Sequence, residues 1–230
     1  MATGIFFQEV QLPKQKSYDD GVIFPVVPES PCKLFFFCEE EPGSGGETPI
    51  VLSHIIYEKM KERHPDFVSR LEEHGLTYII IMSDDDYPSS FTGSSWKSAY
   101  MTDDKKVAEE RAAKMGTKLE WIENGVKTIT GPLPAIRFDK ESERKTWFNN
   151  LTGPVNGEGK IYDQGTFIEL GNGEVVPDEA MRDCLKILEE ECVNIPWKKG
   201  DIMLVNNLTV LHSRLPLLKP PRRILASLCK

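Results

Sequence analysis

The chain has 230 residues, of which 40% are apolar, so it is long enough for one sizeable hydrophobic core. Acidic residues outnumber basic ones by 36 to 28, and the resulting net charge of −8 argues against a nucleic-acid partner. The chain shows no apolar run of about 18 residues and no secretory leader pattern, so we predict no membrane partner and a cytoplasmic location. The five cysteines lack the spacing of a disulfide framework, which predicts reduced thiols.

Residues 1–31 are expected to form an extended N-terminal arm, because they contain four prolines and no periodic hydrophobic pattern. One domain is predicted from residue 32 to residue 230. It opens with a strongly apolar strand candidate from Leu34 to Cys38, and the turn-rich segment PGSGGETP follows that strand. Further strands are predicted at LTYIIIM (76–82), on both sides of Asn124-Gly125, at AIRFD (135–139), at KTWFNN (145–150), at DIMLV and at RRILASL. A Gly-rich loop is expected at 153–173.

Helices are predicted where apolar residues recur at helical spacing. One spans roughly 54–63, and a second begins at Pro65 and ends before Gly75. A third is expected at 103–115, and the clearest starts near Asp178 and carries one continuous apolar stripe. Many strands and few long helices indicate a mainly β fold with flanking helices, in the form of a sandwich or barrel.

Two residues toward the C-terminal end suggest metal and oxoacid chemistry. His212 follows an apolar run, and Arg223 comes eleven residues later in the sequence PPRR. Non-haem Fe(II) oxygenases bind iron through two histidines and one carboxylate, and a 2-oxoglutarate co-substrate adds a far carboxylate that an arginine neutralises well. His212 and Arg223 are therefore candidates for such a site. The structural alternatives are a hydrogen-bonded core histidine and an exposed arginine.

The order GGETP, WKKGD, VLHSR and PPRR resembles the TauD/TfdA family of Fe(II)/2-oxoglutarate-dependent dioxygenases, and closely a plant subgroup described as clavaminate synthase-like. The resemblance runs from about Lys33 to Lys230 and includes KLFFFCEEEPGSGGETPIVLSHIIYEKM, GPLPAIRFD and WFNN. It implies a double-stranded β-helix, or jelly roll, with covering helices. It also implies Fe(II) and 2-oxoglutarate as cofactors and the hydroxylation of a small organic substrate.

The same resemblance assigns roles to individual positions. It makes His212 the distal iron ligand and Thr48 of GGETP the hydroxyl that hydrogen-bonds 2-oxoglutarate. It makes Arg223 the partner of the far carboxylate, with Arg222 pointing outward. The candidate substrate contacts are Phe148 and Asn149.

One part of the family pattern is missing. The resemblance implies a His-x-Asp or His-x-Glu pair upstream of the GGET turn, but no histidine precedes His54. His64-Pro65-Asp66 spells His-x-Asp, yet it follows GGETP at the junction of two predicted surface helices, so we interpret it as structural. His74, in the last turn of the second helix, is interpreted in the same way. We therefore expect an incomplete jelly roll with one of three iron ligands.

Two hypotheses for function follow. The first is a 2-oxoglutarate-dependent dioxygenase acting on a small organic molecule, which the family favours for the lineage. The alternative is a non-catalytic truncated paralogue, splice form or gene-model product that retains part of the 2-oxoglutarate pocket, which the missing ligand pair favours for this polypeptide. Strands removed from a jelly roll leave their neighbours unpaired, so we also expect self-association through exposed strand edges.

Overall fold

The computed structural model describes residues 6–7, 31–86, 95–148, 151 and 166–229. Most of the predicted N-terminal arm, 1–31, lies outside these ranges. Its described part consists of Pro31 and the short strand β1 (Phe6–Phe7), which pairs antiparallel with β13 (Val210–Arg214). The next strand along the chain is β2 (Lys33–Glu40).

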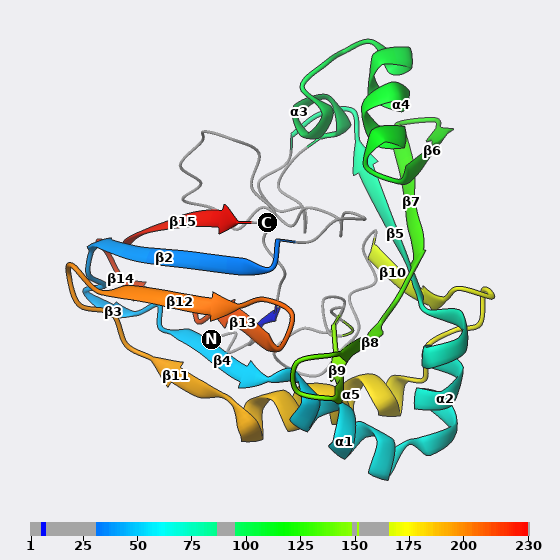
Figure 1. The fold of residues 1–230 in the computed structure, drawn as a ribbon. Coiled ribbons are helices and arrows are strands. Elements are labelled where there is room, and N and C mark those ends of the chain that lie inside the picture. The colour runs from blue at the N-terminus through cyan, green and yellow to red at the C-terminus, as the bar shows by residue number, and fades with distance from the viewer. Residues whose placement is uncertain (1–5, 8–30, 87–94, 149–150, 152–165, 230) are drawn as a thin grey trace.

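Two antiparallel sheets carry the C-terminal motifs (Figure 1). In the first sheet, β2 lies between β12 (Ile202–Asn206) and β15 (Arg223–Cys229). In the second sheet, β4 (Thr48–Leu52) lies between β13 and β11 (Val193–Ile195). A small ladder of β3 (Ser44–Gly45) and β14 (Leu217–Lys219) pairs the segments that lead into β4 and β15.

The two sheets pack face to face because their strands alternate between apolar and polar residues. On β2, Leu34, Phe36 and Cys38 are buried while the residues between them are exposed. These three side chains form one core cluster with Trp197 and Val205, and Val210 of the second sheet packs against that cluster. Alternate side chains of β2, β13 and β15 therefore point into the core between the two sheets.

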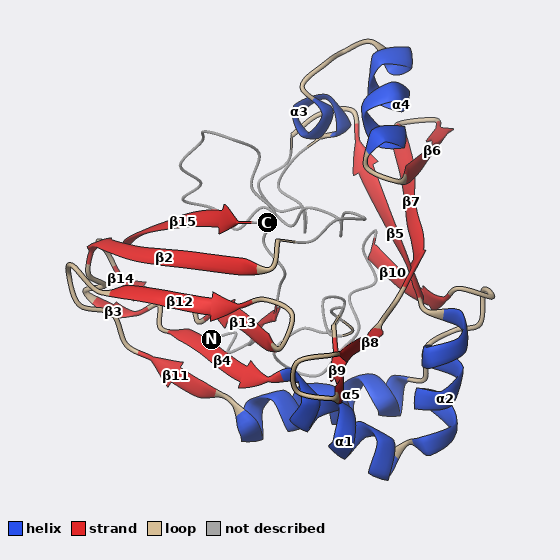
Figure 2. Ribbon diagram, viewed as in Figure 1, coloured by secondary structure: helices blue, strands red, loops and turns tan. Residues whose placement is uncertain are grey.

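Helices cover the other face of the second sheet (Figure 2). They are α1 (Ser53–Arg63) and α5 (Asp178–Glu191), while α2 (Pro65–His74) follows α1 and packs against it. The largest core cluster joins Val51 of β4 to Ile56 and Met60 of α1 and to Cys184 and Leu188 of α5. The apolar stripe predicted for the helix near Asp178 is confirmed as this buried face.

A third sheet lies beside this sandwich and has the order β10-β5-β7-β6. Its strands are β5 (Leu76–Ser83), β6 (Thr117–Ile122), β7 (Gly125–Leu133) and β10 (Thr166–Leu170). Two helices, α3 (Trp96–Tyr100) and α4 (Lys105–Lys114), form a separate core with it. A hairpin of β8 (Ile136–Asp139) and β9 (Arg144–Trp147) completes the described strands.

The predicted class, mainly β with flanking helices, is confirmed. The turn at Asn124-Gly125 does join two paired strands, β6 and β7. One prediction is wrong: the Gly-rich loop expected at 153–173 contains β10, which pairs with β5 along its whole length. The five cysteines all lie in the described ranges and are free thiols. Within those ranges, no helix has both the length and the apolar character needed to cross a membrane.

Candidate functional site

His212 lies on the inner face of β13, between the two sheets. Its strand neighbour on β4 is Ile50, and its ring meets Phe36 of the opposite sheet edge-on, with the ring centroids 5.4 Å apart. Strand alternation explains this placement, because Val210 and His212 share one face while Leu211 packs on the helix side. The side chain is 5% exposed. The sequence pattern VLHSR thus places an imidazole inside an apolar core.

The imidazole of His212 has an unusual electrostatic environment. Burial lowers its pKa to about 4, so the ring is neutral near pH 7. Its Nε2 atom is buried and has no hydrogen-bond partner among the described residues. A buried polar atom without a partner costs roughly 1–3 kcal/mol, so a core histidine kept only for packing is expected to have one. The neutral ring is also the form that binds a metal or accepts a proton from a ligand.

Thr48, the first residue of β4, is buried in the same core. Its Oγ1 accepts a hydrogen bond from Nε1 of Trp197 at 2.8 Å. Because that contact uses the hydroxyl oxygen as an acceptor, the hydroxyl proton can be donated to a ligand. The Trp197 ring lies 6.5 Å from the ring of Phe36, which in turn meets His212. A continuous row of side chains therefore joins Thr48 to His212 across the two sheets.

The two arginines of PPRR differ in exposure and in their partners. Arg223 is exposed and forms an ion pair with Glu39, its Nε lying 2.7 Å from Glu39 Oε2. Arg222 is half-buried, and its Nε donates a hydrogen bond to the carbonyl oxygen of Gly46 at 2.8 Å. The expectation that Arg222 points outward is therefore wrong. The role predicted for Arg223 at the far carboxylate remains a prediction, but Arg222 holds the inward position.

Arg222 is a half-buried cation whose described hydrogen bond goes to a neutral group, so it is suited to bind an anion. Burial, together with the smaller effect of the positive charge of Arg214, lowers its pKa to about 10. Its described hydrogen bond goes to a neutral carbonyl, two residues before Thr48. Gly46 has a φ of +70°, and a Cβ at this position would come within 2.8 Å of Arg222 Cδ. The two glycines of GGETP thus let the chain turn tightly beside the guanidinium.

Phe148 lies apart from these residues. Its ring is buried and stacks under the guanidinium of Arg137, 3.2 Å from the ring centroid, and its backbone N–H donates to Ala135. These contacts belong to the β8–β9 hairpin rather than to the core around His212. Asn149 lies outside the described residues. The assignment of Phe148 and Asn149 to the substrate stays a prediction.

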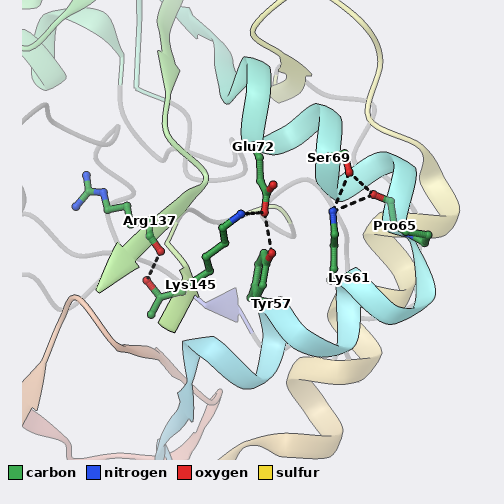
Figure 3. A network of polar contacts seen from close by, with 8 residues as sticks. Tyr57, Lys61, Pro65, Ser69, Glu72, Arg137 and Lys145 are labelled. Carbon is green, nitrogen blue, oxygen red and sulfur yellow. Dashed lines mark hydrogen bonds and ion pairs between the residues drawn. The ribbon is translucent and has the colours of Figure 1, made fainter. Parts of the chain in front are cut away.

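The β8–β9 hairpin is itself fastened to the helices by a polar network (Figure 3). Glu72 of α2 accepts hydrogen bonds from Tyr57 of α1 at 2.8 Å and from Lys145 of β9 at 2.9 Å. Burial alone would raise the pKa of Glu72, but the hydrogen bonds from Lys145 and Tyr57 outweigh it and lower that pKa. In the same view, Lys61 and Ser69 tie the end of α1 to α2. All of these polar groups have partners, so we interpret the network as structural.

Comparison with known proteins shows the family to which the chain belongs. The family model described as taurine catabolism dioxygenase TauD, TfdA family, matches residues 24–229. The chain belongs to the TauD, TfdA family. A clavaminate synthase-like protein of Arabidopsis thaliana is 54% identical over 206 residues, which cover 89% of this chain and 62% of that protein. The dapdiamide synthesis protein DdaC of Enterobacter agglomerans is 24% identical over 204 residues, covering 81% of this chain and 57% of DdaC.

This TauD-family chain therefore spans about 60% of the length of the curated relatives that it matches. Two solved structures are also similar. One is a protein of Burkholderia xenovorans described as a putative alpha-ketoglutarate dependent 2,4-D dioxygenase, with a TM-score of 0.47 and 17% identity over 88% of this chain and 63% of the other. The second is AAD-2 in complex with Mn(II) and N-oxalylglycine, with a TM-score of 0.44 and 12% identity over 88% of this chain and 56% of the other.

The TauD family implies an iron site, and among the described residues His212 is the one side chain that fits a ligand of that metal. In the described ranges, no group of three or more His, Cys, Asp or Glu side chains is placed to hold a metal ion. His64 is occupied elsewhere, because its Nε2 lies 2.9 Å from Asp183 Oδ2 and ties the α1–α2 junction to α5. The orphaned Nε2 of His212 fits a metal ligand, but the described residues do not complete a three-donor site.

Two residues of the site were missed by sequence reasoning. Arg222 shares strand parity with Ile224 and Ala226, both of which pack into the core, and this parity was the signal available for its inward orientation. Trp197, in WKKGD, gave no local signal for its hydrogen bond to Thr48, because the two residues are 149 positions apart.

Proposed function

We propose that this chain supplies the distal histidine and the 2-oxoglutarate pocket of an Fe(II)- and 2-oxoglutarate-dependent dioxygenase that acts on a small organic substrate. The observation that carries the proposal is one core that holds a neutral imidazole with an orphaned nitrogen and a half-buried guanidinium hydrogen-bonded to a carbonyl. Burying such groups without a ligand is costly, and a dicarboxylate of suitable length compensates them.

Each residue of the proposed site has a role that follows from the chemistry of its side chain. Arg222 neutralises the far carboxylate of 2-oxoglutarate, since the nearby Gly46 carbonyl orients its planar fork. Thr48 donates its hydroxyl proton to the same carboxylate, while Trp197 fixes the hydroxyl by donating to its oxygen. His212 presents Nε2 toward the interior, and the apolar rings around it limit the access of water. Iron, when bound, supplies the oxidative chemistry, and its remaining donors must come from outside the described residues.

The first test compares the two arginines. We expect Arg222→Met to weaken 2-oxoglutarate binding by about tenfold to a hundredfold, because a hydrogen-bonded ion pair to a carboxylate is lost, which is worth about 1.5–3 kcal/mol. Arg223→Met is the matched control, and it should change the affinity by less than about twofold because Arg223 is exposed and bound to Glu39. Calorimetric titration in the presence of Fe(II) measures both. The opposite order would return the role to Arg223.

A chemical control separates pocket binding from nonspecific anion binding. Pyruvate has the 2-oxoacid group but lacks the far carboxylate, so the wild-type chain should prefer 2-oxoglutarate and Arg222→Met should lose that preference. Absence of 2-oxoglutarate binding at millimolar concentration contradicts the proposal.

The second test concerns iron. Anaerobic titration with Fe(II) and 2-oxoglutarate produces a visible charge-transfer band when the oxoacid chelates the metal. A band of full intensity, lost in His212→Leu, supports the dioxygenase. Binding of 2-oxoglutarate without any band supports instead the non-catalytic alternative, a chain that retains part of the pocket.

A further inference from the structure

The outer face of the first sheet, turned away from the His212 core, is apolar. Five large hydrophobic side chains are exposed there across three adjacent strands: Phe35 (39%), Phe37 (40%), Ile202 (72%), Leu204 (58%) and Leu225 (40%). Exposed apolar side chains are ordinary when they are scattered, but a contiguous group is unusual in a monomer.

The strand register makes these five side chains one patch. Phe37 lies between Ile202 of β12 and Leu225 of β15, and Phe35 lies beside Leu204. The three strands lie side by side along their length (Figure 2). We call these five residues the outer patch.

Charged residues border the outer patch at both ends of β2. Lys33 is exposed at one end, and the Arg223–Glu39 ion pair lies at the other. Glu40, the exposed register partner of Arg223, lies at the same end, so the patch is bordered by two cations and two anions, although the whole chain has a net charge of −8. An apolar centre with a polar rim is the anatomy of protein–protein interfaces. Two chains that repel each other elsewhere can meet at this face without a like-charge cost.

We propose that the outer patch is the interface at which a second copy of this chain binds, through the same patch on both copies. With about 200 Å² for a fully exposed side chain of this size, the exposed fractions correspond to about 500 Å² of apolar surface per copy. Two copies then bury about 1,000 Å² through these side chains alone, which reaches the lower limit of specific interfaces before the rim is counted.

The geometry of sheets supports this symmetric arrangement. Sheets stack face to face at a spacing of about 10 Å, where side chains from the two faces interdigitate. A two-fold axis through the centre of the patch places β2 of one copy over β2 of the other, so the phenylalanines of the two copies pack together and the aliphatic residues Ile202, Leu204 and Leu225 of the flanking strands surround them. The inference refines the expected self-association, because it assigns the contact to a face of the sheet rather than to strand edges.

Sedimentation velocity of the 230-residue chain from about 1 to 100 μM tests the proposal. We expect a species of twice the 26.1 kDa chain mass at the higher concentrations. Ile202→Lys and Leu225→Lys, on the two strands that flank β2, should each raise the dimer dissociation constant about tenfold or more, because a charge is buried in the centre of the interface. The matched control is Ile122→Lys, at an exposed isoleucine of β6 outside the patch, and it should leave the dimer unchanged.

Two outcomes would overturn the inference. One is a monomer at 100 μM, which would mean that the patch stays exposed or is covered by other residues of the same chain. The other is a dimer that persists in both patch variants. Far-ultraviolet circular dichroism of each variant confirms that it is folded, and because two strands are probed independently, the failure of one variant to fold leaves the other decisive. None of these results depends on 2-oxoglutarate binding.

Discussion

The β10-β5-β7-β6 sheet and the β4–β13 strand pair both bury polar side chains, but they differ in whether those side chains have partners. In the first region, Thr117 and Thr130 hydrogen-bond each other at 2.7 Å, and Trp96 donates to Asp84 at 2.6 Å. In the described part of the chain, the buried side-chain atoms that lack a hydrogen-bond partner lie instead at the start of α1 and on β13, apart from Glu39 Oε2 on β2, which forms the ion pair with Arg223. Those on β13 belong to His212 and Ser213.

The two regions therefore differ in how their buried polar groups affect the stability of the fold. A satisfied polar group specifies a structure at little cost, whereas an orphaned one lowers stability and persists where function requires it. The third sheet with α3 and α4 is therefore expected to govern stability. The sandwich around His212 is expected to give up stability for ligand binding.

The largest effect expected on stability comes from the first region. Trp96 is 2% exposed and meets Trp121 edge-on at 4.9 Å, so Trp96→Ala should lower the free energy of unfolding by about 3–5 kcal/mol. Urea unfolding monitored by circular dichroism measures this. At low temperature, where the variant stays folded, its affinity for 2-oxoglutarate should match the wild type. A parallel loss of affinity would show that the two regions are not separate.

The next-largest effect is the loss of folding stability in acid. The pKa of His212 is lowered from 6.5 to about 4 in the folded chain, so the unfolded state binds more protons between these values and stability falls as the pH drops through this window. The loss amounts to about 3 kcal/mol between pH 6.5 and pH 4.

His212→Leu removes this titration and is the matched variant. It should unfold at higher urea than the wild type at pH 7, by about 1 kcal/mol, because an orphaned polar atom leaves the core. It should also lose less stability on acidification. If both proteins show the same dependence on pH, the imidazole is hydrogen-bonded or hydrated in solution.

The smallest destabilisation is expected from the loss of a hydrogen-bond pair in the third sheet. Thr117→Val leaves the buried hydroxyl of Thr130 without its partner and should cost about 1–3 kcal/mol. Thr117→Val combined with Thr130→Val should recover much of that loss, since no polar atom then remains unpaired. A double-mutant cycle in urea gives the coupling energy. Strict additivity would mean that the 2.7 Å contact contributes nothing.

Several elements could be predicted from the sequence because local patterns determine them. The helix expected at 103–115 is α4, Lys105–Lys114, and its N-cap Asp104 accepts from two backbone N–H groups. Pro65 begins α2 and Gly75 follows it, as the capping rules indicate. In contrast, β10 follows a segment rich in glycine, and its pairing with β5 is a long-range contact that local propensity does not reveal.

The candidate site also contains some residues that local motifs predict and others that depend on tertiary structure. His212 and Thr48 could be chosen from their motifs, and both are buried in the core between the sheets. The choice between Arg222 and Arg223 depended on strand parity at the start of β15, where the register with β2 shifts between Arg223 and Ile224. The extra residue at this shift is Glu39 on β2, so the alternation along β15 was a usable signal, but the motif PPRR alone does not show where the strand begins.

The hydrogen bond from Trp197 to Thr48 gives this chain a built-in optical reporter. Of its four tryptophans, Trp197 is the one whose indole N–H touches the hydroxyl proposed to meet 2-oxoglutarate. Its fluorescence depends on the polarity next to that N–H, so a carboxylate arriving at Thr48 should change the emission without any added label. Occupancy of the pocket can therefore be followed in the native protein by light alone.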